Sequence, residues 1–265
     1  MKPIGKTHDT IKQIRKTKNK NVRDGIAYVE QIGVLEKFLA GKNIAQFNVN
    51  TLLICEPLIN TDYARDIQIE LMDLATDVYT ISEQTYELIC EKKNNAGLFA
   101  LIDFSQPSTL EFEKQDYKNI VIIDGLENPG NVGTIFRTAD ACGIDAIVCV
   151  DLKTMVYGKK CISSSRGMVF KIPTLSLSFE KAHDLLSSNG YTCYLCEPED
   201  GEPYNQVTFD DKKAIIVGSE RFGINDDWYD HDHKRIFIPM QGSMTSLNVG
   251  VAASLIMYEC MKKIK

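Results

Sequence analysis

Three polar segments that follow predicted strands carry the residues of this 265-residue chain best suited to chemistry. The first contains Asn131 and Arg137, the second contains Glu220, and the third contains Ser246 and Asn248. Each follows an apolar, β-rich stretch through a turn made of Gly, Asn, Ser or Pro. In parallel α/β sheets, the loops at the carboxyl ends of the strands meet at one crevice, where ligands bind. We therefore expect these three segments to form one site.

The two charged side chains of this site have different expected roles. The guanidinium of Arg137 could bind a phosphate through two parallel hydrogen bonds and stabilise developing negative charge on an oxygen. It would be a poor general base, because arginine keeps its proton in proteins. Glu220 follows a buried strand, where an unpaired charge is costly. We expect Arg137 or the substrate to supply its partner, and a surface pair with Arg221 is the plainer alternative.

The neutral polar side chains have two interpretations. Asn131, Ser246 and Asn248 could each hydrogen-bond a ligand or orient a neighbouring side chain. Each also stands near the start of a predicted helix, where Asn and Ser are ordinary capping residues. The residue types alone leave both interpretations open.

The spacing of these residues matches three motifs of a known family. Asn-x-Gly followed after four residues by Arg occupies 131–137, Gly-x-Glu-x-x-Gly occupies 218–223, and Ile-Pro-Met followed by Ser-Leu-Asn occupies 238–248. In order and spacing, roughly the last 150 residues resemble the SpoU/TrmH group of RNA methyltransferases, the SPOUT class. Three motifs in order are far more specific than one.

This resemblance implies an activity and a cofactor. It implies transfer of a methyl group from S-adenosylmethionine to a ribose 2′-hydroxyl of structured RNA, with ribosomal RNA favoured over transfer RNA. It also implies a deep trefoil knot in the C-terminal domain and a homodimer. The residues that match catalytic positions are Asn131, Arg137, Glu220, Ser246 and Asn248. Those that match or adjoin cofactor-binding positions are Gly218, Ser219, Ile238, Met240 and Leu247. Without the resemblance, Ile238 would be an ordinary core residue of a strand.

The chain is long enough for one large domain or two modest ones. Strands alternate with helical patterns throughout, which predicts the α/β class, with a parallel sheet in the C-terminal part. We expect a basic arm over 1–24, a small α/β RNA-substrate domain over 25–110 and the methyltransferase domain over 117–265. The polar stretch 111–119 is the best linker candidate. Expected helices include 27–40, 66–75, 179–189 and 248–263, with a further helix capped by Ser82.

The distribution of charge favours RNA more than the net charge of −6 does. Eight of the 30 Lys and Arg residues lie within residues 1–24, together with only two acidic residues. A basic arm on an acidic body is typical of nucleic-acid binding, because phosphate contacts supply affinity that is independent of sequence. A solvated terminus is the plainer alternative.

Several other classes of protein and site are disfavoured. No apolar run approaches the roughly 18 residues of a membrane helix, and the N-terminus lacks a signal-peptide core, so a cytoplasmic protein is expected. Cys193 and Cys196 form one Cys-x-x-Cys pair, but their spacing puts them on opposite faces of a strand. His231 and His233 have no apparent ligand partner, so no metal site is expected.

Two other functions remain as alternatives. The chain could be a non-catalytic RNA-binding or ribosome-assembly protein that retains the fold, in which case it would not bind the cofactor. A nicotinamide-dependent oxidoreductase ranks last, because the Gly-x-Gly-x-x-Gly fingerprint of dinucleotide-binding folds is missing.

Overall fold

In the computed structural model the chain forms two compact units. The first comprises Met1–Ser105 and Tyr157–Lys171, and the second comprises Gln106–Val156 and Ile172–Lys265. The segment Tyr157–Lys171 thus groups with the first unit, although it lies within the predicted domain 117–265. The sequence-based domain boundaries stay a prediction. The structure describes all residues except 18–24, 42–45, 91–95, 106 and 263–265.

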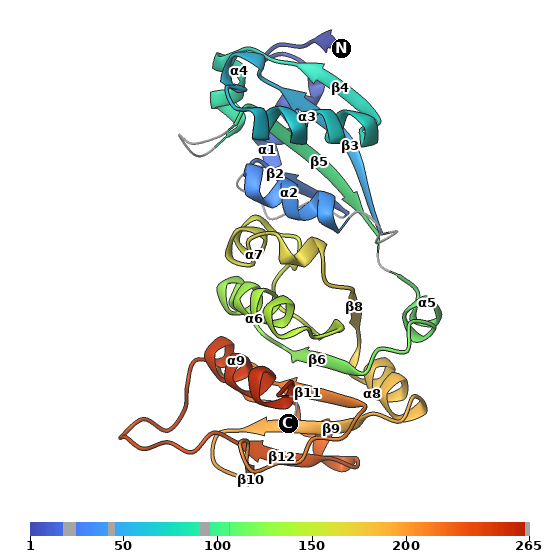
Figure 1. Ribbon diagram of the computed structural model, residues 1–265, viewed down its shortest axis with the longest axis vertical. Coiled ribbons are helices and arrows are strands. Elements are labelled where there is room, and N and C mark those ends of the chain that lie inside the picture. Colours follow the sequence, from blue (N-terminus) through green and yellow to red (C-terminus); the bar gives the residue numbers. More distant parts are fainter. Residues whose placement is uncertain (18–24, 42–45, 91–95, 106, 263–265) are drawn as a thin grey trace. The chain divides into compact units, whose positions relative to one another are not determined.

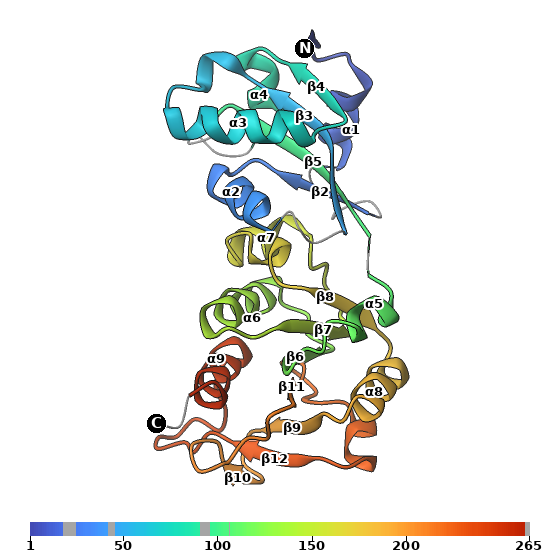
Figure 2. The ribbon, with the colours of Figure 1, turned by 45° about the vertical axis from the view of Figure 1, so that its right-hand side comes forward.

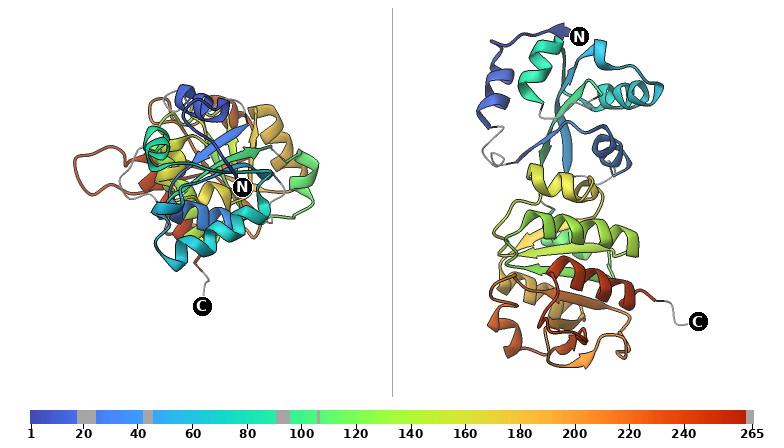
Figure 3. Two further views of the ribbon diagram at one scale, coloured as in Figure 1. Left: turned by 90° about the horizontal axis from the view of Figure 1, so that it is seen from above. Right: turned by 90° about the vertical axis from the view of Figure 1, so that its left-hand side faces the viewer.

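The first unit is an α/β layer around a mixed sheet. Its described strands follow the order β1-β4-β3-β5-β2, and β5 runs antiparallel to both β2 and β3. Helices α1 and α4 pack on one face of the sheet, and α2 and α3 pack on the other (Figure 3). The strands are β1 (Lys2–Pro3), β2 (Ile26–Val29), β3 (Phe47–Ile54), β4 (Asp77–Thr80) and β5 (Leu98–Phe104). The helices are α1 (Asp9–Thr17), α2 (Ile32–Ala40), η1 (Glu56–Leu58), α3 (Asp62–Leu74), α4 (Glu83–Ile89), α7 (Lys159–Ser164) and η2 (Met168–Phe170).

Most helices of the first unit lie where the sequence predicted them. The helix predicted over 66–75 lies within α3, which starts earlier because Thr61 caps it. Ser82 caps α4 by accepting a hydrogen bond from the backbone of Thr85, as predicted. The prediction of a helix over 27–40 is wrong in its first part, where residues form β2 with alternating burial. That period of two is typical of a strand, and it precedes the helical pattern directly.

The described part of the predicted basic arm is folded. Strand β1 pairs with β4, and Ile11 and Ile14 of α1 are 0% and 1% exposed in the core of the first unit. The basic residues Lys12, Arg15 and Lys16 occupy the exposed side of α1. The rest of the predicted arm, residues 18–24, lies outside the described residues. Over its described part the basic segment is therefore a docked amphipathic helix, and a free tail is excluded there.

A cluster of aromatic rings fixes Tyr157–Lys171 within the first unit. Phe170 contacts Phe38 edge-on at a centroid distance of 5.5 Å and Phe47 at 5.3 Å. Tyr157 contacts Phe47 at 5.4 Å and Phe104 at 4.3 Å. Such pairs add stability beyond the apolar area that they bury.

We predict that Phe170→Ala lowers the free energy of unfolding by about 3–5 kcal/mol, because it removes a fully buried ring that the cluster cannot replace. Phe222→Ala is the matched control, since that phenylalanine is 82% exposed, and its effect should stay within about 0.5 kcal/mol. Chemical denaturation followed by circular dichroism measures both. Equal losses would contradict the role of the cluster.

The second unit is built on a parallel sheet. In the described residues, seven strands follow the order β10-β12-β9-β11-β6-β7-β8, and every pairing is parallel. Helices α6 and α9 lie together on one face, and α8 lies on the other (Figures 1 and 2). The strands are β6 (Asn119–Asp124), β7 (Ala146–Val150), β8 (Thr174–Leu177), β9 (Thr192–Glu197), β10 (Glu202–Pro203), β11 (Lys213–Val217) and β12 (Lys234–Phe237). The helices are α5 (Thr109–Glu113), α6 (Pro129–Cys142), α8 (Phe179–Ser188), η3 (Asp226–Asp230) and α9 (Val249–Cys260).

These elements confirm the predicted α/β class and correct one segment. The helices expected over 179–189 and 248–263 correspond to α8 and α9. The linker expected over 111–119 is wrong for residues 111–113, because Ser108 and Glu111 form a capping box that starts α5. Phe112 of this short helix is buried in the core. The Ser-x-x-Glu pattern signals such a helix start in the sequence.

The strand order places the predicted loops together. Strand β11 pairs with β6 on one side and with β9 on the other, so Ala214 lies opposite both Ile120 and Cys193. Since all these strands run in one direction, the loops after β6, β9, β11 and β12 leave the sheet at the same edge. The knot implied by the family resemblance stays a prediction.

No helix in the described parts of the chain has both the length and the apolar character needed to cross a membrane.

Candidate active site

Two side-chain hydrogen bonds connect the three predicted loops. The amide of Asn248 donates from Nδ2 to Oδ1 of Asn131 at 3.0 Å. Asn131 in turn donates from Nδ2 to Oε1 of Glu220 at 2.7 Å. These residues come from the start of α9, the start of α6 and the loop after β11, so side chains far apart in the sequence form one chain of hydrogen bonds.

Neutral donors hold the carboxylate of Glu220. The backbone N–H of Glu127 donates to Oε2 at 3.2 Å, and that of Asn128 donates to Oε1 at 3.3 Å. Partial burial favours the neutral carboxyl, but the bonds from Asn131 and the backbone outweigh it and lower the pKa of Glu220 below its usual value. The expectation of an arginine partner is wrong for the residues that the structure describes, where neither Arg137 nor Arg221 pairs with Glu220.

Asn131 and Asn248, the two asparagines in this chain of hydrogen bonds, differ in their helix-capping roles. Asn248 caps α9, since its Oδ1 accepts from the backbone of Gly250 at 3.0 Å and of Val251 at 3.3 Å. Its Nδ2 still donates to Asn131, so the same side chain caps the helix and takes part in the site. Asn131 does not cap α6, because Asn128 fills that position. The capping interpretation of Asn131 is therefore wrong, and this side chain is 8% exposed within the site.

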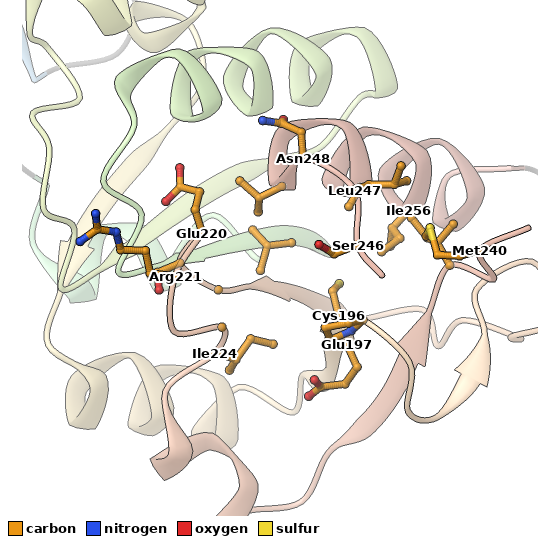
Figure 4. A pocket seen from close by; sticks show the side chains of 18 of the residues that line it. Cys196, Glu197, Glu220, Arg221, Ile224, Met240, Ser246, Leu247, Asn248 and Ile256 are labelled. Atoms are coloured by element: carbon orange, nitrogen blue, oxygen red, sulfur yellow. The ribbon is translucent and has the colours of Figure 1, made fainter. Parts of the chain in front are cut away.

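A cavity of about 550 Å³ lies beside this chain of hydrogen bonds. Figure 4 shows Glu220 and Asn248 on one side of it, Met240 and Ile256 on the other, and Ser246 between them. The predicted residues that line it are Gly218, Ser219, Glu220, Ile238, Met240, Ser246, Leu247 and Asn248. The cavity therefore brings together all five residues that match cofactor-binding positions with three that match catalytic ones.

The loop after β11 forms a closed turn. Ser219 donates its backbone N–H to the carbonyl of Gly223 at 2.8 Å, and Gly223 donates back at 3.1 Å. A Cβ on Gly218 would lie 2.1 Å from the backbone of both Gly223 and Ile224. Only glycine fits there, so its first role is to let the turn close against its own backbone.

Arg137 lies apart from the cavity. It is exposed on α6, and in the described part of the chain it joins neither the chain of hydrogen bonds nor the cavity wall. The structure therefore places nine of the ten predicted residues in or beside the cavity, and Arg137 remains available to an external ligand.

Part of the cavity wall comes from residues that the sequence did not single out. Cys196 and Glu197 end β9, Pro198 follows it, and Ala252 and Ile256 come from α9. The first three obey the rule used for the other loops, since they end a strand-like stretch in a parallel sheet. Applying that rule to every predicted strand would have found them. The two α9 residues give no such signal.

The described residues hold no group of three or more His, Cys, Asp or Glu side chains arranged for a metal ion. Burial raises the pKa of the Cys196 thiol in the cavity wall, so this cysteine is not an activated nucleophile.

Comparison with known proteins decides the family. A profile of the SpoU rRNA Methylase family matches residues 118–258, more than half of the chain. The chain belongs to this family. The match spans all three motifs, from the loop after β6 to the last helix.

Two relatives of this chain are named as RNA methyltransferases, one of them as putative. The chain is 26% identical over 253 residues to the 23S rRNA (guanosine(2553)-2′-O)-methyltransferase RlmP of Bacillus subtilis (strain 168), covering 94% of this chain and 98% of RlmP. It is 31% identical over 222 residues to a putative TrmH family tRNA/rRNA methyltransferase of Staphylococcus aureus (strain MSSA476), covering 81% and 89% of the two chains.

Solved structures share the SpoU fold. The crystal structure of an RNA 2′-O ribose methyltransferase matches with a TM-score of 0.74 at 26% identity, over 98% of each chain. The SpoU methyltransferase AviRb from Streptomyces viridochromogenes, in complex with the cofactor AdoMet, has a TM-score of 0.79 at 23% identity, over 96% of this chain and 97% of AviRb.

We predict that Asn131→Ala raises the pKa of Glu220 toward its ordinary value, because it removes the shortest hydrogen bond to the ionised carboxylate. A carboxyl whose pKa is lowered on folding stabilises the protein above its ordinary pKa, and this stability is lost as the pH falls through the lowered value. NMR titration with ¹³C-labelled glutamate measures the shift.

Asn128→Ala is the control for this titration. Its side chain caps α6 by accepting a hydrogen bond from the backbone of Gly130. The bond from residue 128 to Glu220 comes from the backbone and survives the substitution. An equal shift in both variants would contradict the role assigned to the Asn131 amide.

Proposed function

We propose that this SpoU-family protein transfers a methyl group from S-adenosylmethionine to a ribose 2′-hydroxyl of ribosomal RNA. The observation that carries the proposal is the cavity lined by Gly218, Leu247 and Asn248, with the bonds from Asn248 through Asn131 to Glu220 beside it. The named activity of RlmP and the cofactor complex of AviRb support the same function.

The residues of the cavity fit S-adenosylmethionine. The volume of the cavity lies within the range of about 300–1,000 Å³ that is usual for small-ligand sites. Ile238, Leu247 and Ile256 offer apolar surface for an adenine ring, and the backbone at Gly218 allows close approach. Glu197 and Ser246 add polar groups for a ribose or an amino acid. When bound, the cofactor supplies a methyl group activated by a sulfonium.

The protein's own side chains would orient the reaction. Glu220 is ionised at neutral pH and holds Asn131, which in turn holds Asn248 next to the cavity. Ser246 lines the same wall and could bond the ribose. Holding the reacting groups in line is worth on the order of 7–11 kcal/mol of the barrier. Arg137 would bind an RNA phosphate and stabilise the developing negative charge of the 2′-oxygen.

We also propose that the protein is a cytoplasmic homodimer. Val251, Leu255 and Tyr258 form an apolar stripe along α9, and they are 47%, 40% and 56% exposed. Residues spaced by four and three positions share one helix face, and a second copy of this chain is the partner that we expect to cover it.

Methyl transfer from radiolabelled S-adenosylmethionine to size-separated RNA from cells lacking this gene tests the function. Label in one ribosomal RNA that survives as an alkali-resistant dinucleotide is the expected result, because a 2′-O-methyl group blocks alkaline cleavage. Cofactor binding without label in any RNA would contradict this substrate class. Absence of cofactor binding would favour the non-catalytic RNA-binding alternative.

We predict that Arg137→Ala lowers the rate of methyl transfer by about 10²- to 10³-fold, because one charge-stabilising donor is lost. The dissociation constant for S-adenosylmethionine should stay within about threefold of the wild type, since Arg137 does not line the cavity. Single-turnover kinetics and calorimetry measure the two quantities. Arg137→Lys keeps the charge but loses the planar fork, so a partial loss is expected. A parallel loss of cofactor binding would contradict the assignment to the RNA side.

We further predict that α1 contributes phosphate contacts. Replacing Lys12, Arg15 and Lys16 by Ala should weaken RNA binding and reduce the salt slope of log K by up to about 2. Substitution is preferable to truncation, because deleting residues 1–24 would also remove the buried Ile11 and Ile14. Binding isotherms at several salt concentrations measure the slope. Lys114→Ala with Lys181→Ala, two exposed lysines of the second unit, is the control. An unchanged salt slope in the α1 variant would show that these basic residues are solvated and do not contact RNA phosphates.

A further inference from the structure

Asp124, the last residue of β6, is a buried carboxyl group that the proposed chemistry does not use. Its side chain is 3% exposed, and its Oδ2 accepts a hydrogen bond from the backbone N–H of Asn225 at 2.8 Å. Asn225 comes directly after the loop Gly218–Ile224, which carries Glu220. Asp124 therefore ties the far end of the catalytic loop to the end of a neighbouring strand.

Burial makes this arrangement costly. Desolvation raises the pKa of Asp124, the hydrogen bond from the backbone of Asn225 acts in the opposite direction, and Asp151 and Asp227 raise it further. Within the described structure, Nε1 of Trp228 is buried and has no hydrogen-bond partner of good geometry. An ionisable group kept in such surroundings is a candidate for a functional role.

Further hydrogen bonds join the loop Gly218–Ile224 to the segment between β6 and α6. Glu220 accepts hydrogen bonds from the backbone of Glu127 and Asn128, and Asn225 donates to Asp124. Both ties therefore end within residues 124–128, which lead from β6 into α6. The first holds the carboxylate, and the second holds the backbone that follows the turn. Together they fix the position from which Glu220 reaches Asn131.

We infer that Asp124 is a positioning residue for the catalytic loop: by holding the N–H of Asn225, it keeps Glu220 in bonding distance of Asn131. Asp124 itself does not line the cavity and is assigned no contact with substrate or cofactor. This inference rests on the proposed methyltransferase function for its kinetic consequence, but the tie itself does not depend on that function.

Two pairs of variants isolate the tie. Asp124→Leu removes the acceptor, whereas Asp124→Asn keeps an acceptor oxygen without the charge. Asn225→Pro removes the donor, and its φ of −59° suits proline. Asn225→Ala keeps the N–H and removes only the side-chain bonds to Asp227. Each disruptive change thus has a conservative partner at the same position.

Asp145, which directly precedes β7, provides a control at the other end of β6. Its Oδ2 accepts from the backbone of Lys118 at 2.9 Å and of Asn119 at 2.8 Å, at the opposite end of β6 from the site. Asp145→Ala removes a comparable carboxylate–backbone tie away from the catalytic loop. It reports what the loss of such a tie does to stability alone.

The first measurement is hydrogen–deuterium exchange of peptides covering 218–226, with folding checked by circular dichroism. We expect Asp124→Leu and Asn225→Pro to speed exchange in this segment by at least tenfold, and Asp124→Asn, Asn225→Ala and Asp145→Ala to leave it within about threefold. If Asp124→Leu does not fold, Asn225→Pro decides the result. Unchanged exchange in the disruptive variants would overturn the inference, even if the wild type methylates RNA.

The second measurement is a double-mutant cycle on the rate of methyl transfer. Asp124→Leu should slow the wild-type enzyme by about 10- to 100-fold, because a displacement on the order of 1 Å has that effect on a catalytic group. In the Glu220→Gln background the same change should cost less than about threefold, because the group that it positions has already been altered. Equal losses in both backgrounds would overturn the positioning role. A wild type that methylates no RNA would refute the proposed function, and the exchange result would still decide whether the tie exists.

Discussion

The parallel pairing of β11 with both β6 and β9 is the constraint on which the candidate active site depends. It places the loop that carries Glu220 beside the connection from β6 to α6, whose backbone N–H groups and Asn131 then reach the carboxylate. The end of β9 and the loop after β12 supply further residues of the cavity wall. A strand order with β11 at an edge of the sheet would separate these groups, whatever residues they contained.

The site holds its acidic group without using a cation. Glu220 is satisfied by an amide and two backbone donors, so its negative charge requires no arginine. Arg137 is exposed on α6 and does not pair with Glu220 in the described part of the chain, so its donors stay available for the RNA phosphate contact that we propose. For a protein that binds RNA this arrangement is favourable, because an ion pair between Arg137 and Glu220 would have to be broken before Arg137 could bind a phosphate. Because the donors to Glu220 are neutral, salt also screens these hydrogen bonds less than it screens an exposed ion pair.

The sequence predicted the second unit well because each signal there was local. Apolar strands and polar turns located the loops, the resemblance to the SpoU/TrmH motifs singled out Gly218 and Leu247, and the direction of parallel strands explained why the loops converge. The partner of Glu220 was not predictable, since a backbone N–H carries no sequence signal. The role of Asn131 required knowing that Asn128 caps the helix. The grouping of Tyr157–Lys171 with the first unit was equally hidden, because the rings that hold the segment are distant in sequence.

That grouping has a consequence for the synthesis of the chain. Phe170 and Tyr157 complete the aromatic cluster of the first unit, yet they are translated after β6 and β7 of the second. The aromatic cluster therefore cannot be complete while only the first hundred or so residues have left the ribosome. The apolar core around Ile11 and Leu101 needs no residue beyond β5, so it can assemble during translation before the aromatic cluster does.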